Sequence, residues 1–203
     1  PIDESAPKGR LILPQQMTLR ELLDIHAKVM LVQETELASA IEALSGKVSA
    51  VITDSQVFEY VKRIVPDEIY LTSFSILMQR YKGVLDVALS GLSALETLED
   101  GDKLLISEGC THHRQCKDIG TVKLPGWITK YTGKKLDFEF TQGGTFPKDL
   151  SAYKMIVHCG GCMLNEAEMK HRISLAKEAD VPMTNYGVTI AHLTGILDKI
   201  ATV

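Results

Sequence analysis

Apolar residues along the chain follow two spacings, one typical of helices and one typical of short buried strands. In the N-terminal part, helical spacing predicts three helices, and short apolar runs predict strands between and after them. The first helix carries Leu19, Leu22 and Leu23, and His26 continues its apolar stripe as a core histidine. The later helices cover residues 37–44 and 57–64, and the predicted strands are 29–32, 50–52 and 69–71.

The C-terminal part repeats this alternation after a long apolar segment. Gly83 precedes a predicted helix from Val84 to Leu98, in which almost every second residue is apolar. Such a helix lies either inside a core or in a subunit interface. Further helices are predicted near 127–131 and over 165–179 and 188–200, with strands at 103–107, 136–140, 155–157 and 182–184.

Short, non-alternating apolar strands between helices are typical of parallel sheets that are covered on both faces. The sequence therefore predicts an α/β protein of two small domains, each a mostly parallel sheet flanked by helices. The boundary is expected near Gly83.

Composition narrows the class of protein. The chain has 203 residues, of which 45% are hydrophobic and 24% charged, so intrinsic disorder is excluded. No apolar run approaches the ~18 residues of a membrane span, and the net charge of −4 gives no basic surface. We therefore expect neither membrane nor nucleic acid as a partner. Four cysteines are too few for a disulfide scaffold and indicate a reducing compartment, the cytoplasm.

The N-terminal segment is polar, contains proline and glycine, and lacks both an initiator Met and the features of a signal peptide. Residues 1–12 are expected to be a linker, and the chain is expected to be the C-terminal part of a longer protein.

All four cysteines lie in the C-terminal part, in two groups. One group contains Cys110, His112, His113 and Cys116, and the other is the segment 158–162. Each group begins where a predicted strand ends. Because the carboxyl ends of parallel strands lie along one edge of a sheet, the two groups are expected to converge on one site.

The chemistry of these residues favours a metal. Cys159 and Cys162 present two sulfurs, and the two glycines between them let the backbone curl closely around a metal. Asn165 followed by Glu168 predicts a helix cap, and the positive end of that helix is expected to lower the thiolate pKa. Cys110 is the expected third sulfur. Zinc and an iron–sulfur cluster both remain open on these residues alone.

The other polar residues of the two groups receive simpler interpretations. Cys116 is expected to be a free thiol. His112 and His158 are candidate ligands, although hydrogen bonding around the site is favoured for both. Asp3, in the linker, is an outside candidate for a carboxylate ligand. Asn185, directly after the last predicted strand, either lines the site or caps the next helix.

The order Cys110-x-His112, a long spacer and His158-Cys159-x-x-Cys162 resembles the signature of the HydF family of [FeFe]-hydrogenase maturation GTPases. Further segments are also similar to that family, so the resemblance covers nearly the whole chain. These segments are 6–10, 53–56, 71–75, 118–120 and 184–188.

The resemblance implies a [4Fe–4S] cluster on Cys110, Cys159 and Cys162, with an exchangeable fourth site. His112, His158 and Asp3 are the candidates for that site. The family acts as a scaffold that receives a diiron precursor from the radical-SAM maturases HydE and HydG and delivers it to apo-[FeFe]-hydrogenase.

The resemblance also implies a homodimer, with a dimerisation domain at 13–82 and a cluster-binding domain at 83–203. The family's GTPase domain is expected to be missing from this chain, because G-x-x-x-x-G-K-[ST] does not occur, and GTP is expected to bind only in that domain. No catalytic residue and no turnover are expected of this chain. Two alternatives are a zinc-stabilised interaction module and a thiol–disulfide oxidoreductase that uses Cys159 and Cys162.

Overall fold

The computed structural model describes residues 1–2, 9–109 and 118–201. The strands are β1 (Ala50–Thr53), β2 (Tyr70–Ser73), β3 (Lys103–Glu108), β4 (Asp137–Gln142), β5 (Met155–His158) and β6 (Met183–Asn185). The α-helices are α1 (Leu13–Asp24), α2 (Leu37–Ala43), α3 (Phe58–Val61), α4 (Phe74–Tyr81), α5 (Leu85–Ser90), α6 (Leu124–Thr132), α7 (Glu166–Glu178), α8 (Tyr186–Leu193) and α9 (Leu197–Ala201). Short 3₁₀ or π turns are η1 (Glu34–Glu36), η2 (Ser55–Val57), η3 (Gly91–Thr97) and η4 (Ile119–Lys123).

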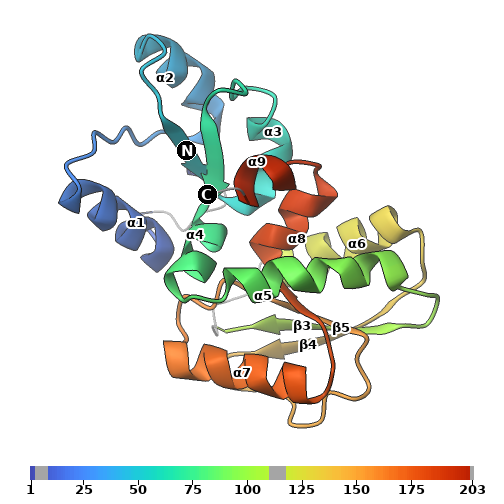
Figure 1. Ribbon diagram of the computed structural model, residues 1–203. Coiled ribbons are helices and arrows are strands. Elements are labelled where there is room, and N and C mark those ends of the chain that lie inside the picture. The colour runs from blue at the N-terminus through green and yellow to red at the C-terminus, as the bar shows by residue number, and fades with distance from the viewer. Residues whose placement is uncertain (3–8, 110–117, 202–203) are drawn as a thin grey trace.

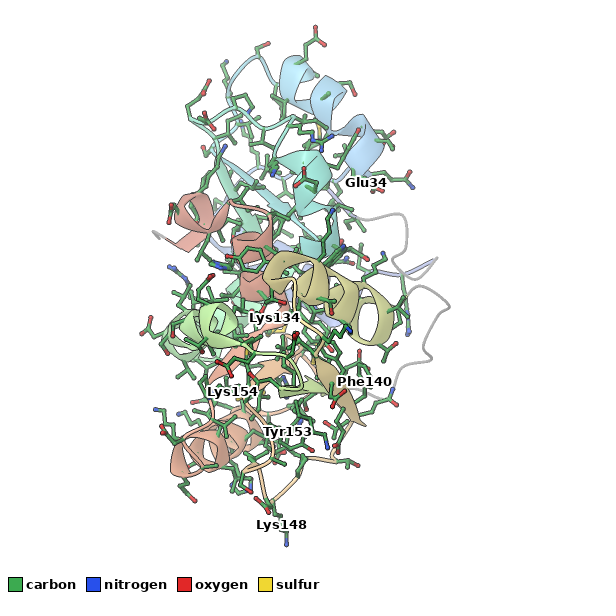
Figure 2. The ribbon with its side chains drawn as sticks, turned by 90° about the vertical axis from the view of Figure 1, so that its right-hand side faces the viewer. Glu34, Lys134, Phe140, Lys148, Tyr153 and Lys154 are labelled. Atoms are coloured by element: carbon green, nitrogen blue, oxygen red, sulfur yellow. The ribbon has the colours of Figure 1, made fainter. Side chains whose placement is uncertain are left out.

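The strands form two parallel sheets, as the sequence predicts. β1 and β2 make a two-stranded sheet in the N-terminal part, and the second sheet has the order β4-β3-β5-β6. Figure 2 shows an elongated molecule in which Glu34 lies in the upper half and Lys148 at the opposite end. None of the helices in the described part of the chain is long and apolar enough to cross a membrane.

The central strands β3 and β5 are buried on both faces of the sheet, which explains their continuous apolar sequences, whereas the edge strand β4 is partly exposed. Leu104 and Ile106 of β3 point into one apolar core and Leu105 into the other, and all three are fully buried. In Figure 1, α7 covers one face, while α5, α6 and α8 lie on the other. Burial of alternate residues on opposite faces is the arrangement expected of a covered parallel sheet.

The two parts of the chain share one core rather than standing apart. The larger apolar cluster runs from Leu37 in α2 to Ile200 in α9. Tyr70 of β2 donates a hydrogen bond to the carbonyl oxygen of Ile200 at 3.1 Å. The Lys62 ammonium donates to the carbonyl oxygen of Thr194 at 2.7 Å, so the C-terminal helices pack on the N-terminal sheet.

Two expectations for the N-terminal part are wrong. Residues 29–32 form no strand, and the only pairing nearby within the described residues is an isolated bridge between Ile2 and Gln33. Among the described residues this apolar run has no neighbouring strand to pair with, and Met30 and Leu31 remain 50% and 52% exposed. His26 is exposed rather than in the core, because α1 ends at Asp24 and His26 turns into the left-handed region with φ 57°.

Two long predicted helices are interrupted. The segment 84–98 divides into α5 and the 3₁₀ turn η3, and most of its apolar residues are buried in the core. A Cβ atom on Gly91 would lie 2.3 Å from the carbonyl oxygen of Met183, so only glycine allows this approach to β6. The segment 188–200 divides into α8 and α9 at Gly195, which has φ 69°.

Candidate metal centre

Residues 159–165, which connect β5 to α7, are called the cysteine loop. This loop lies where the direction of the strand order in the four-stranded sheet reverses. β3 pairs with β4 on one side and with β5 on the other. The connection after β3 therefore runs to one side of the sheet, and the connection after β5 runs to the other. Ligands of parallel sheets bind at such a point, outside the carboxyl ends of the strands. β3 ends at Glu108 and β5 ends at His158, directly before Cys159.

Cys159 is held by the end of the neighbouring strand. Its backbone N–H donates to the carbonyl oxygen of Ser107 at 2.8 Å. Its Sγ accepts hydrogen bonds from the backbone N–H of Gly109 at 2.9 Å and of Gly161 at 3.3 Å. Gly109, the last described residue before Cys110, therefore lies against a sulfur of the second cysteine group.

Glycine is required where the loop curls. Gly161 has φ 63°, and a Cβ atom there would lie 2.7 Å from Sδ of Met169. A Cβ atom on Gly109 would lie 2.8 Å from Leu164 Cγ. The expectation that glycines allow a close turn is confirmed at Gly161, where a side chain would strain the backbone and displace the side chain of Met169.

Cys162 precedes the predicted helix start. Asn165 caps α7, and its Oδ1 accepts from the backbone N–H of Glu168 at 2.8 Å, as predicted. Burial nevertheless raises the pKa of the Cys162 thiol. The Lys82 ammonium and the backbone N–H groups of Cys162 and Met163 act in the opposite direction. At Cys162 the shift is therefore opposite to the expected one, because desolvation is the larger effect.

Both ring nitrogens of His158 form hydrogen bonds within the protein. Its Nε2 lies 3.1 Å from Nη1 of Arg172, and its Nδ1 lies 2.8 Å from the carbonyl oxygen of Cys159. Because a guanidinium can only donate, Nε2 accepts and Nδ1 carries the proton that is donated to Cys159. Burial, assisted by the positive charges of Arg172 and Lys82, lowers the pKa of His158 to about 4. These contacts favour a role in positioning Cys159 over direct ligation.

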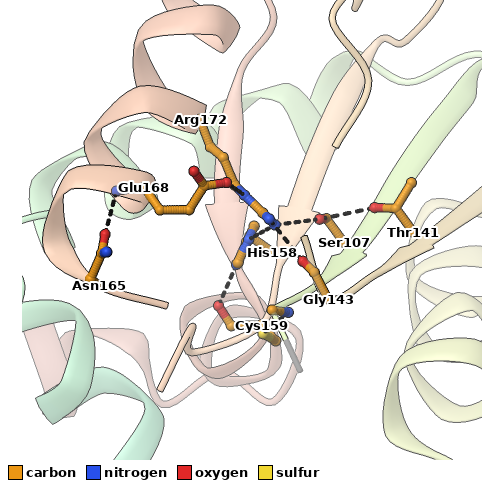
Figure 3. Close-up of polar contacts among 9 residues, drawn as sticks. Ser107, Thr141, Gly143, His158, Cys159, Asn165, Glu168 and Arg172 are labelled. Carbon is orange, nitrogen blue, oxygen red and sulfur yellow. Dashed lines mark hydrogen bonds and ion pairs between the residues drawn. The ribbon is translucent and has the colours of Figure 1, made fainter. Parts of the chain in front are cut away.

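Arg172 organises the buried side of this edge (Figure 3). It is fully buried, and its Nε pairs with the Glu168 carboxylate at 2.7 Å. Its Nη2 donates to the carbonyl oxygen of Gly143 at 2.8 Å, and its Nη1 lies 3.4 Å from Ser107 Oγ. One guanidinium thus connects α7 with β3, β5 and the loop after β4. Sequence reasoning missed Arg172, although an i,i+4 pair of Glu and Arg was visible on the predicted helix.

Two buried carboxylates lie on either side of segment 110–117. Glu108 is 2% exposed, and Oε1 accepts from the Tyr186 hydroxyl at 3.4 Å. Asp118 Oδ2 accepts from the backbone N–H of Gly120 at 3.1 Å and of Thr121 at 2.9 Å. Burial raises the pKa of Tyr186 well above its usual value. The described chain on both sides of the first cysteine group is therefore firmly anchored.

Asn185 follows β6 on the same edge. Its Oδ1 accepts from the backbone N–H of Val188 at 2.8 Å, which confirms the predicted cap. Its Nδ2 donates to Ser75 Oγ of α4 at 3.1 Å. This residue therefore connects the carboxyl edge of the second sheet with a helix of the N-terminal part.

The remaining candidates lie outside the described residues, namely Asp3, Cys110, His112, His113 and Cys116. Among the residues that the structure describes, no third His, Cys, Asp or Glu joins Cys159 and Cys162 in a group that could hold a metal ion. The assignment of the third sulfur and of the fourth ligand stays a prediction.

Two family models together match the chain over almost its whole length. The hydrogen maturase F dimerization domain matches residues 1–83, and the hydrogen maturase F tetramerization domain matches residues 86–203. The first match ends just after α4, and the second begins within α5. A search of curated proteins finds no match.

Proposed function

This chain belongs to the hydrogen maturase F family, and on that basis we propose that it carries an iron–sulfur cluster during hydrogenase maturation. The matched domains themselves imply a role in hydrogenase maturation. The cluster is a [4Fe–4S] cluster held by Cys110, Cys159 and Cys162. The cargo is a diiron precursor, received from HydE and HydG and delivered to apo-[FeFe]-hydrogenase.

One observation carries the proposal: Cys159 Sγ accepts two backbone N–H bonds at the switch point of the sheet, one of them from the neighbour of Cys110. Hydrogen bonds to cluster sulfurs are a feature of iron–sulfur sites, so the residues present fit the group. A cluster held by three thiolates supplies an iron with an exchangeable ligand, to which a diiron precursor can attach.

The fourth ligand remains open between His112 and Asp3 within the chain, and an external ligand is the other source. His158 fits a positioning role, because both of its ring nitrogens are bonded within the protein. We propose that it keeps the Cys159 carbonyl oriented while the sulfur faces the metal.

The test is anaerobic reconstitution with iron and sulfide, followed by iron, sulfide and zinc analysis. We expect about four irons per chain. Cys110→Ser, Cys159→Ser and Cys162→Ser should each lose iron, whereas Cys116→Ser, a matched control from the same group, should retain it. One tightly bound zinc and no iron would replace the proposal with the zinc module. Thiol-reductase activity of the metal-free protein would favour the oxidoreductase alternative.

Self-association is the second function of the matched domains, and we propose that a homodimer forms through one apolar face. This face comprises Leu23, Ile25, Met30 and Leu31, which are 50–72% exposed although they are large and apolar. Met30 and Leu31 line an open groove of about 1000 Å³ between α1, α2 and β1, to which neither of the two described cysteines contributes. A contiguous exposed apolar surface is typical of an interaction site. The dimerization-domain match over residues 1–83 favours a second copy as its partner.

A further inference from the structure

The loop between β5 and α7 has no regular secondary structure, yet side chains hold most of its carbonyl groups. His158 holds the carbonyl of Cys159 from within the same domain. The carbonyls of Gly160, Gly161 and Leu164 are held from α4, which belongs to the other matched domain. The cysteine loop is therefore built by both domains.

Lys82, at the C-terminal end of α4, makes the central contact. Its side chain is buried, and the residue is only 7% exposed. The Nζ atom donates to the carbonyl oxygen of Gly161 at 2.6 Å and also to that of Leu164. Buried lysines usually pair with a negatively charged group, whereas the hydrogen-bond acceptors of Lys82 are two uncharged carbonyl oxygens near Cys162. This arrangement raises the question of which charge the ammonium offsets.

Gln79, one turn earlier on α4, makes the neighbouring contact. It is 3% exposed, and its Nε2 donates to the carbonyl oxygen of Gly160 at 3.1 Å. Gly160 also lies against Ser75, because a Cβ atom on Gly160 would be 3.4 Å from Ser75 Oγ. One face of α4 thus follows the loop from Gly160 to Leu164.

The electrostatic surroundings of Lys82 indicate what its charge does. Burial lowers the pKa of Lys82, and the Glu166 carboxylate, together with any negative charge on Cys162 and Cys159, acts in the opposite direction. The ammonium is therefore placed where negative charge on the two sulfurs would stabilise it. Metal–thiolate sites carry such charge, whereas a pair of neutral thiols does not.

We propose that Lys82 and Gln79 are positioning residues of the metal centre, supplied by the dimerization domain, and that Lys82 offsets the negative charge of the metal–thiolate group. Residues 86–203 alone would then form an incomplete site. The claim that Lys82 offsets negative charge, the charge part, rests on the proposed cluster. The claim that Lys82 and Gln79 hold the cysteine loop in place, the positioning part, does not depend on a metal.

The positioning part is tested on the full metal-free chain by hydrogen exchange of peptides covering residues 159–165. Lys82→Met removes the charge and the donors at similar length, and Gln79→Leu removes only a neutral donor. We expect exchange in this loop to accelerate by about tenfold or more in Lys82→Met, because hydrogen bonds from charged donors are the stronger ones. Gln79→Leu should accelerate it less.

Lys62→Met is the matched control. Lys62 also joins the two parts of the chain by donating to a backbone carbonyl, that of Thr194, but it does not contact the cysteine loop. Its loss should leave exchange at 159–165 unchanged. Equal acceleration in the control, or unchanged exchange in both α4 variants, would overturn the positioning role.

The charge part is tested by the midpoint potential of the reconstituted cluster. Loss of a nearby positive charge disfavours the more negative, reduced state, so Lys82→Met should shift the potential to more negative values than Gln79→Leu does. Equal potentials in these two variants would overturn the charge role. If Lys82→Met does not fold, Lys82→Gln replaces it in the comparison of potentials. Hydrogen exchange in Gln79→Leu then decides whether α4 positions the loop.

The two arms also separate this inference from the proposed function. If the chain binds no iron, the cluster proposal and the charge role both fail. The exchange result on the metal-free protein still decides whether α4 positions the loop.

Discussion

At the level of single residues, the candidate metal centre depends on side chains that hold its backbone rather than on sulfur alone. His158 and Arg172 form a continuous network under the loop, and neither polar group faces solvent. The cap at Asn165 and the turn at Gly161 were predictable, because asparagine and glycine have characteristic local roles. Arg172 was not, since its partners at Ser107 and Gly143 are distant in sequence and depend on strand order.

Replacing Arg172 should be strongly destabilising. In Arg172→Met the carbonyl of Gly143 and Nε2 of His158 lose their donor while remaining buried, so we expect a loss of about 2–4 kcal/mol in the free energy of unfolding. Urea denaturation measures it. Arg63→Met, which breaks an exposed i,i+4 pair with Glu59, should change stability by less than about 0.5 kcal/mol. Equal effects of the two substitutions would contradict the structural role of Arg172.

His158 should make the metal-free protein acid-sensitive. Its pKa is lowered to about 4 in the folded chain, chiefly by burial, whereas an unfolded histidine titrates near 6.5. The unfolded state therefore binds the proton more readily, and stability should fall as pH decreases from about 6.5 to 4, by up to about 3 kcal/mol.

His158→Gln should remove this part of the pH dependence, while His171→Gln, on the exposed side of α7, should keep it. Urea midpoints between pH 7 and pH 4 provide the comparison. An unchanged profile in His158→Gln would show that another group is responsible.

At the level of elements, the sequence predicts the strands of the second sheet well and the helices less evenly. Strands buried on both faces appear as uninterrupted apolar runs, which is why β3 and β5 were predicted nearly to the residue. The segment 188–200 was predicted as one helix because its apolar pattern continues across Gly195, where a left-handed turn ends α8 before α9 begins at Leu197. The run 29–32 has strand composition but no partner strand, and composition alone cannot supply one.

Gly161→Ala tests the turn in the cysteine loop. A Cβ atom would meet Met169 in a backbone conformation that alanine adopts poorly, so we expect a stability loss of about 1–3 kcal/mol together with lower iron content. Gly144→Ala is the matched control, because nothing lies within 4 Å of its added Cβ atom. Thermal unfolding and iron analysis of both variants measure the effect. A fully loaded, stable Gly161→Ala would contradict the tight turn.

At the level of the whole molecule, the two matched domains share a core and a site. The larger apolar cluster extends from α2 to α9, and α4 reaches the cysteine loop. Sequence reasoning placed a domain boundary near Gly83, between the last strand of the first sheet and the first strand of the second, and that division stays a prediction. It did not predict that helices of one part pack on the sheet of the other, because such contacts leave no local pattern.

The proposed dimer face is testable at this level. Met30→Asp places a charge in the apolar surface and should dissociate the homodimer, which sedimentation velocity at micromolar concentration would detect. Val122→Asp, a residue of equal exposure in the C-terminal part, should leave the dimer intact. A dimeric Met30→Asp would exclude this face as the interface.

The electron paramagnetic resonance spectrum of the reduced, iron-reconstituted chain tests the central claim most directly. We predict a signal of a reduced [4Fe–4S] cluster, at about four irons per chain, which disappears in Cys159→Ser. A spectrum without a cluster signal, from a folded wild-type chain that holds only zinc, would contradict the account.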